Sequence, residues 1–175
     1  KGVYGVNLGD SQQTVEAKLG DPSVELNTLK GEKVLGYGRN HWFHFQDSKL
    51  VKVDTKPYGL EYGSLNNVPL RNFFDDQQWM INDKYGFRTP LREIQLDLGL
   101  TRQKVIDDTI RISDENYELV FRLLTKNDPY SEKKTYFLGG FSLALKSYKK
   151  SPSSTFNDSE SQFEALNTHF NNFEK

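Results

Sequence analysis

The stretch that decides the fold is residues 6–22, which read Val-Asn-Leu-Gly-Asp-Ser-Gln-Gln-Thr-Val-Glu-Ala-Lys-Leu-Gly-Asp-Pro. Ser11 is a good N-cap for a helix that begins at Gln12, because its hydroxyl can accept from an N–H group that has no partner inside the helix. Val15 and Leu19 are four residues apart and therefore share the buried face. The closing Gly-Asp-Pro ends the helix, since glycine suits the position after the last turn and proline cannot continue it. We expect one short helix here.

Four strands are expected after this helix. In one of them, Trp42 and His44 alternate with Phe43 and Phe45, so the two pairs face opposite sides of a sheet. The four predicted strands cover residues 23–29, 34–37, 42–45 and 50–53.

The start of this module recurs at residues 96–105, which align with residues 6–15, and four of the ten aligned pairs are identical. The alignment predicts a second helix with Thr101 as its N-cap, followed by a stripe of Val105, Ile106 and Ile110. Strands are expected again at residues 118–124, 135–138 and 141–148. Gly139-Gly140 between the last two is a typical two-residue hairpin turn.

These patterns predict an α+β fold of two tandem modules, each a short helical segment packed on a small antiparallel sheet, plus a C-terminal helix. The modules are residues 1–56 and 93–150. Residues 57–92 form an ordered connection, because they are too rich in aromatic residues for a flexible linker. Residues 151–175 are a linker and an amphipathic helix, whose apolar stripe is Phe163, Leu166, Phe170 and Phe173.

Composition excludes several classes of protein. The 175 residues contain no cysteine, which removes disulfides, cysteine-based zinc sites and thiol nucleophiles. Lys plus Arg number 23 and Asp plus Glu number 24, so there is no general attraction to nucleic acid. No apolar stretch approaches the length of about 20 residues that a membrane span requires. Cysteine-free chains occur in the periplasm and in the cytoplasm alike.

The pattern Leu-Gly-x-Ser-x-x-x-Val-x-x-x-Leu-Gly-x-Pro, from Leu8 to Pro22, resembles a signature of bacterial cell-envelope proteins. It is similar to the SmpA/OmlA small lipoproteins and to the modules of β-lactamase inhibitory protein, which is itself a tandem duplication. The resemblance implies short helices on small antiparallel sheets, a concave aromatic surface that holds another protein, and a periplasmic or envelope-associated location, with the cytoplasm as the alternative. It carries over no functional residue, because the shared positions are structural.

The candidate partner-binding residues are aromatic. Tyrosine and tryptophan favour interfaces because they combine a large apolar area with a polar tip. Each of them can equally be a core residue, since one face of a sheet must be covered. The candidates are Tyr37, Trp42 and His44 on one sheet face, and Tyr58, Tyr62, Trp79 and Tyr85 in the connection.

The motifs give no catalytic residue, metal site or cofactor. His41 and His44 lie three apart on a predicted strand, so they point to opposite faces and cannot easily bind one ion. Acid–base catalysis needs two carboxylates brought together in a cleft, which neighbours in sequence do not provide by themselves. The two such pairs are Asp75-Asp76 and Asp107-Asp108, and we expect Asp107-Asp108 to lie within or near the end of a helix.

We therefore expect a non-enzymatic binding protein of the bacterial cell envelope that holds a protein or peptide partner on an aromatic sheet surface. One alternative is a small-ligand-binding protein or enzyme with a site between the modules, using groups such as Asp75, Asp76, Arg88 or Arg92. Another is a structural domain that docks through the C-terminal helix. The oligomeric state is left open.

Overall fold

The computed structural model describes residues 2–28, 31–56, 66–68, 79–81, 83–127 and 134–148. These residues are mostly β-structure. The helices are α1 (Gln12–Leu19) and α3 (Leu91–Asp97). The strands are β1 (Gly2–Val3), β2 (Val6–Asn7), β3 (Val24–Asn27), β4 (Lys33–Tyr37), β5 (His41–Gln46), β6 (Lys49–Asp54), β7 (Met80–Ile81), β8 (Tyr85–Gly86), β9 (Thr109–Ser113), β10 (Tyr117–Asn127) and β11 (Lys134–Leu145).

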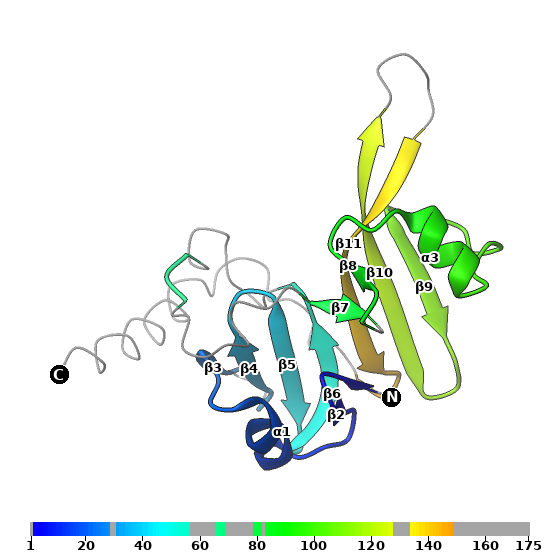
Figure 1. Cartoon of the computed structure of the whole chain (residues 1–175). Coiled ribbons are helices and arrows are strands. Elements are labelled where there is room, and N and C mark those ends of the chain that lie inside the picture. Colours follow the sequence, from blue (N-terminus) through cyan, green and yellow to red (C-terminus); the bar gives the residue numbers. More distant parts are fainter. Residues whose placement is uncertain are drawn as a thin grey trace.

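Seven of these strands form one antiparallel sheet in the order β3-β4-β5-β6-β11-β10-β9 (Figure 1). The strands β3 to β6 are a meander, in which each strand pairs with the next one along the chain. The join to the second half is the pairing of β6 with β11, where Leu143 lies opposite Val53. Two small hairpins, β1-β2 and β7-β8, stand outside the sheet. Both halves of the chain therefore share a single sheet.

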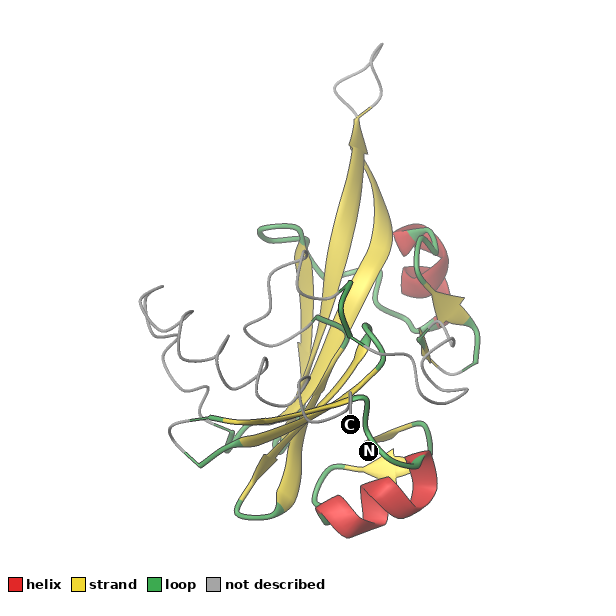
Figure 2. Ribbon diagram, turned by 90° about the vertical axis from the view of Figure 1, so that its left-hand side faces the viewer, coloured by secondary structure: helices red, strands yellow, loops and turns green. Residues whose placement is uncertain are grey.

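Both helices cover the same face of this sheet (Figure 2). Val15 of α1 is fully buried in a cluster with strand residues such as Phe43 and Leu50. Ile94 of α3 is equally buried, in a second cluster that includes Phe121 and Leu138. Burial of apolar side chains from both helices is the main stabilising term of this face.

The helix expected from residues 6–22 is confirmed. The backbone N–H of Thr14 donates to the Ser11 hydroxyl at 3.2 Å, so Ser11 is the N-cap. Gly20 follows α1 with a φ of 82° and donates to the carbonyl of Glu16 at 2.8 Å. Few residues other than glycine adopt such a backbone φ, and a residue with this φ ends the helix.

The alternation in β5 is also confirmed. Phe43 and Phe45 belong to the cluster under α1. Trp42 points to the opposite face and packs with Val24, Val34 and Val68.

The second helix is not where the repeat predicted it. Residues 101–108 form turns and loop, and Asp107 and Asp108 occupy a two-residue turn with φ values of 48° and 52°. Ile110, expected on the helix, lies in β9. The helix is α3, about ten residues earlier, with Leu91 and Ile94 as its buried residues.

The error comes from the shared Leu-Gly pair, which serves opposite ends of the two helices. Leu8-Gly9 precedes α1, whereas Leu98-Gly99 follows α3. Gly99 has a φ of 67°, and the N–H of Leu100 donates to the carbonyl of Gln95 at 2.8 Å. This bond, with the partly buried Leu100 packed on the core, is the Schellman arrangement that ends a helix.

Gly139-Gly140 is not a hairpin turn either. The strand β11 runs through both residues, and the ladder shifts so that Arg122 lies opposite Gly140 while Leu123 lies opposite Leu138. Gly139 is the extra residue of a β-bulge. A Cβ at Gly140 would lie 2.5 Å from Thr55 Oγ1, so the absence of a side chain serves close packing rather than a turn.

The predicted fold class is therefore wrong. The described residues form a mostly β structure, one seven-stranded antiparallel sheet with two short helices, and not two helix-on-sheet modules. The predicted C-terminal helix with Phe163, Leu166, Phe170 and Phe173 lies outside the described residues.

The packing around Trp42 gives a test of the fold. A Cβ at Gly36 would lie 2.7 Å from Trp42 Cζ3, so Gly36→Ala forces the fully buried indole to move. We expect the free energy of unfolding in urea to fall by about 1–3 kcal/mol. Gly86→Ala is the control, because its Cβ meets its nearest atom at an ordinary 3.5 Å and should cost under about 0.5 kcal/mol. Equal losses for the two variants would contradict this packing.

Candidate functional site

The described members of the predicted aromatic surface lie in the interior. Tyr37, Trp42 and His44 are 0–1% exposed, and Trp79 and Tyr85 are 3–4% exposed. Tyr58 and Tyr62 lie outside the described residues, as do Asp75 and Asp76.

Each buried aromatic has a packing or hydrogen-bonding role. Tyr37 donates its hydroxyl to the carbonyl of Gly20 at 2.9 Å, and its ring meets Phe43 edge-on at 5.4 Å. Trp42 donates its indole N–H to the carbonyl of Arg39 at 3.0 Å. Such contacts satisfy the polar tips that would otherwise be exposed to a partner.

Trp79 and Tyr85 are held in the same way on the helix-covered face. The ring of Trp79 meets Phe141 at 5.6 Å, and the hydroxyl of Tyr85 donates to Asp97 at 2.8 Å. The described part of the chain therefore supplies no open aromatic surface from the predicted set.

A row of ionisable side chains crosses the sheet face opposite the helices, and sequence reasoning missed most of it. At one end, His44 Nδ1 lies 2.9 Å from Glu32 Oε1, and the Tyr148 hydroxyl donates to the same oxygen at 2.8 Å. Glu32 and His44 side chains are 2% and 1% exposed. Two hydrogen bonds to one buried carboxylate tie β5 and the segment that follows β11 to the turn before β4.

Burial and hydrogen bonding act in opposite directions on this pair. Burial lowers the pKa of His44, and the hydrogen bond that His44 donates to Glu32 offsets only part of that decrease. For Glu32, burial by itself raises the pKa, but the hydrogen bonds from His44 and Tyr148 bring it below the usual value. At neutral pH the pair is a neutral imidazole that donates to a carboxylate.

The second part of the row lies at the join of the two half-sheets. Arg122 of β10 reaches over β11 and donates to Asp54 of β6, and its Nη2 also lies 2.9 Å from Thr55 Oγ1. The same nitrogen donates to the Phe141 carbonyl at 2.8 Å. Lys52 forms an ion pair with Asp54 at 2.8 Å. The guanidinium thus links three neighbouring strands.

These charges hold Asp54 ionised although its side chain is only 7% exposed. Burial raises the pKa of Asp54, but the charges of Lys52 and Arg122, with hydrogen bonds from Lys52 and the backbone N–H of Lys56, lower it by more, so the net pKa is below the usual value. No local signal could have found this contact, because 68 residues separate its two ends.

His41 and His44 lie on opposite faces of the sheet. His41 lies against the Tyr4 ring at 5.1 Å, while His44 bonds Glu32 on the opposite face. Within the described residues, no group of three or more His, Asp or Glu side chains is arranged to hold a metal ion. The ionisable row is a set of structural cross-links, since its members face one another.

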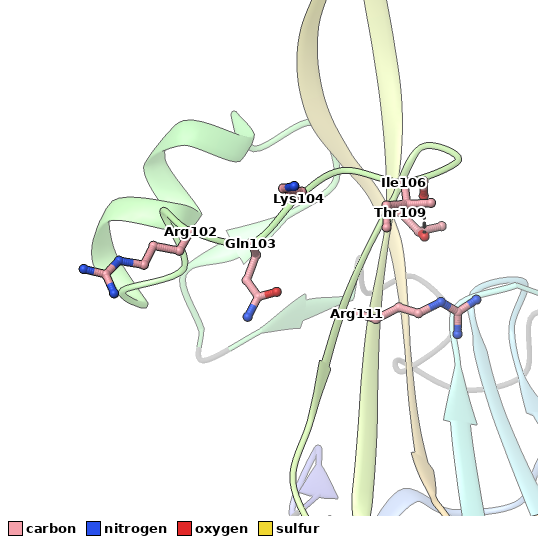
Figure 3. Close-up of a pocket in the computed structure, with 6 residues that line it drawn as sticks. All are labelled: Arg102, Gln103, Lys104, Ile106, Thr109 and Arg111. Atoms are coloured by element: carbon pink, nitrogen blue, oxygen red, sulfur yellow. Dashed lines mark hydrogen bonds between the residues drawn. The ribbon is translucent and has the colours of Figure 1, made fainter.

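A hollow lies beside the outer edge of the sheet (Figure 3). Its volume is about 370 Å³ and it is open to solvent on one side. The loop that follows α3 forms one wall and the edge strand β9 forms the other. The lining residues are Arg102, Gln103, Lys104, Ile106, Thr109 and Arg111.

The described residues of the alternative site, Arg88 and Arg92, do not line this hollow. Both are exposed. Arg88 lies over the exposed ring of Phe87, at 5.4 Å from its centre.

Comparison with known proteins adds one remote likeness. No family model matches the chain, and no curated protein matches it. A crystal structure of an extracellular protein containing a SCP domain from Bacillus anthracis str. Ames aligns with a TM-score of 0.42 at 12% identity. The alignment covers 91% of this chain and 54% of that protein, so the chain spans about half of its length. A likeness this weak establishes neither fold nor function.

Neither α1 nor α3, the helices within the described residues, is long and apolar enough to cross a membrane.

Removing Arg122 should weaken the join of the half-sheets. Arg122→Met leaves Asp54 buried with Lys52 as its remaining cation, so we expect a loss of about 2–3 kcal/mol in the free energy of unfolding. Arg111→Met is the matched control. Its ion pair with Glu118 is exposed and 3.4 Å long, and its loss should cost under about 0.5 kcal/mol. The free energy of unfolding of both variants is measured in urea. Similar losses would show that the buried Arg122–Asp54 ion pair contributes little to stability.

The buried His44 imidazole should make the free energy of unfolding fall at mildly acidic pH. The pKa of His44 is lowered in the folded state, so its contribution is complete above the unfolded pKa of about 6.5 and is lost as pH falls through the folded pKa. Asp54 and Glu32 also have lowered pKa values, and their contributions are lost at lower pH, below about 4. Unfolding free energies should therefore fall between pH 7 and 5.

His44→Asn separates the two ranges of pH. An asparagine amide can donate from near the Nδ1 position but does not titrate, so the slope between pH 7 and 5 should flatten while the loss at lower pH remains. An unchanged slope in this variant would assign the mild-acid loss to another group.

Proposed function

We propose that this chain is a non-enzymatic interaction protein of the bacterial cell envelope that holds a protein or peptide partner. The observation that carries the proposal is the contrast between interior and surface. In the described residues, the buried ionisable groups cross-link one another, while the hollow is partly open to solvent and lies at the edge of a sheet. Catalytic and small-ligand sites are usually more enclosed, with an apolar lining and a few convergent polar groups.

The sheet itself offers surfaces of the kind that proteins recognise. It ends at β3 on one side and at β9 on the other, and in the described residues no further strand pairs with either. An open sheet edge presents backbone N–H and C=O groups in a row, which a second polypeptide can use. Because the predicted aromatic residues are buried where they are described, the proposal places the contact on an edge instead.

The envelope location rests on the resemblance of residues 8–22 to the SmpA/OmlA lipoproteins and to β-lactamase inhibitory protein. The helix that those residues form is the one whose cap and end match the expected pattern.

The proposal is tested by cross-linking in fractionated extracts of the producing organism. The purified chain, carrying a lysine-reactive cross-linker, is incubated separately with envelope and cytosolic fractions. We expect a discrete adduct in the envelope fraction that excess unmodified chain competes away. An adduct that appears only with cytosol would overturn the location, and the absence of any saturable adduct would overturn the binding role.

A further inference from the structure

Within the described residues, the outer edge of β9 leaves the backbone groups of two residues without a partner. The N–H of Leu123 donates to the carbonyl of Asp108 at 2.8 Å, and the N–H of Asp114 donates to the carbonyl of Tyr117 at 3.1 Å. Bonding alternates along an antiparallel ladder, so the backbone N–H and C=O groups of Ile110 and Ile112 point toward β10. Those of Thr109, Arg111 and Ser113 point outward, away from the sheet.

Thr109 is satisfied by a local turn. Its N–H donates to the carbonyl of Ile106 at 2.9 Å, and its carbonyl accepts from the N–H of Ile106 at 3.0 Å. Arg111 and Ser113 are left with outward N–H and C=O groups, and no backbone partner for them is recorded in the part of the chain that the structure describes. Two residues that each offer a donor and an acceptor are enough to start a ladder with an added strand.

The surroundings of this edge are basic. Arg102, Lys104 and Arg111 line the hollow, and within the described residues no ion pair holds Arg102 or Lys104. Arg111 has Glu118 at 3.4 Å, with its own side chain 63% exposed. Figure 3 shows Arg102 and Arg111 pointing away from each other, so positive charge lies on both sides of the edge.

An apolar contact is available in the same place. Ile106 is 65% exposed and lines the hollow at the end of β9. An exposed isoleucine beside an open edge favours association, because its burial would remove a large apolar surface from water.

We propose that β9 accepts an extended segment of a partner protein, in which acidic and apolar side chains alternate, as an eighth strand of the sheet. The inference rests on the proposed function and names the class of partner and the place of contact. An added strand presents side chains to both faces of the sheet, so its acidic groups can reach the cations on either side of the edge while an apolar group packs on Ile106. A second copy of the chain is a poorer occupant, because it would bring its own basic edge against this one.

The test uses a fluorescent, capped octapeptide in which glutamate and valine alternate, titrated into the full chain at low salt. We expect saturable binding by fluorescence anisotropy, with protection of the Arg111 and Ser113 amides in hydrogen exchange. Ser113→Pro removes an outward N–H without touching the β10 ladder and should weaken binding about tenfold or more. Lys104→Glu should weaken binding by a similar factor, about tenfold, and flatten its salt dependence.

Two controls separate this contact from general stickiness. Asn27 lies at the end of the opposite edge strand, with its side chain exposed, so Asn27→Pro should leave binding unchanged. A peptide N-methylated at alternate residues on its pairing edge keeps its charges but cannot form the ladder, and it should not bind. Thermal unfolding confirms that each variant is folded before its affinity is read.

Three outcomes overturn the inference: no saturable binding up to about 1 mM peptide, equal binding of the N-methylated peptide, or a dimer of the free chain that Ser113→Pro dissociates. A cross-linked envelope partner that Ser113→Pro captures as well as the original chain overturns this edge while leaving the proposed function intact. The absence of any such partner overturns the proposed function itself.

Discussion

The structure depends on the pairing of β6 with β11, which turns two groups of strands into one sheet. Only three residue pairs define that register, from Asp54–Ser142 to Lys52–Ala144. The Arg122 guanidinium strengthens the join, because it binds Asp54 on one strand, Thr55 just beyond it and the Phe141 carbonyl on the other. Gly140 leaves room for this contact. Fixed charge in the interior is tolerable here because every group has a partner of opposite charge or a hydrogen bond.

Local signals predicted α1 and the strands β3 to β6 well, whereas the second helix and the ionisable row depend on context and long-range contacts. The N-cap at Ser11 and the glycine after α1 act within one turn of helix, so they can be read from the sequence. The Leu-Gly pair at residues 98–99 has the same sequence as the pair at residues 8–9. Whether such a pair precedes or follows a helix depends on which side of it the apolar stripe lies. Alternation in β5 separated Trp42 from Phe43 correctly, yet it could not show that both faces are buried. Nothing near Arg122 points to Asp54, because the pair is made by topology alone.

Two groups of charged side chains differ in role, buried ones that are paired and exposed ones near β9. Glu32, His44 and Asp54 are buried and bound to fixed partners, which makes them part of the framework. Around β9 the cations are exposed, next to backbone groups that the sheet leaves unused. A charge with a permanent partner stabilises the fold, whereas an exposed cation beside an open edge remains available to another molecule. The proposed recognition at an edge would also account for how little functional information the short sequence motifs carry, since main-chain groups supply much of such a contact.

The join between β6 and β11 has a consequence for how the chain folds during synthesis. Thr55 and Phe141, which bond each other at the join, are separated by 86 residues, so closing that loop costs roughly 4 kcal/mol of chain entropy. The meander β3 to β6 needs only short turns and can form as soon as it leaves the ribosome. Until residues 134–145 are made, β6 is an unprotected edge carrying Val51 and Val53. The nascent chain therefore passes through a stage in which strands of other chains can pair with β6 before its own partner strand has been made.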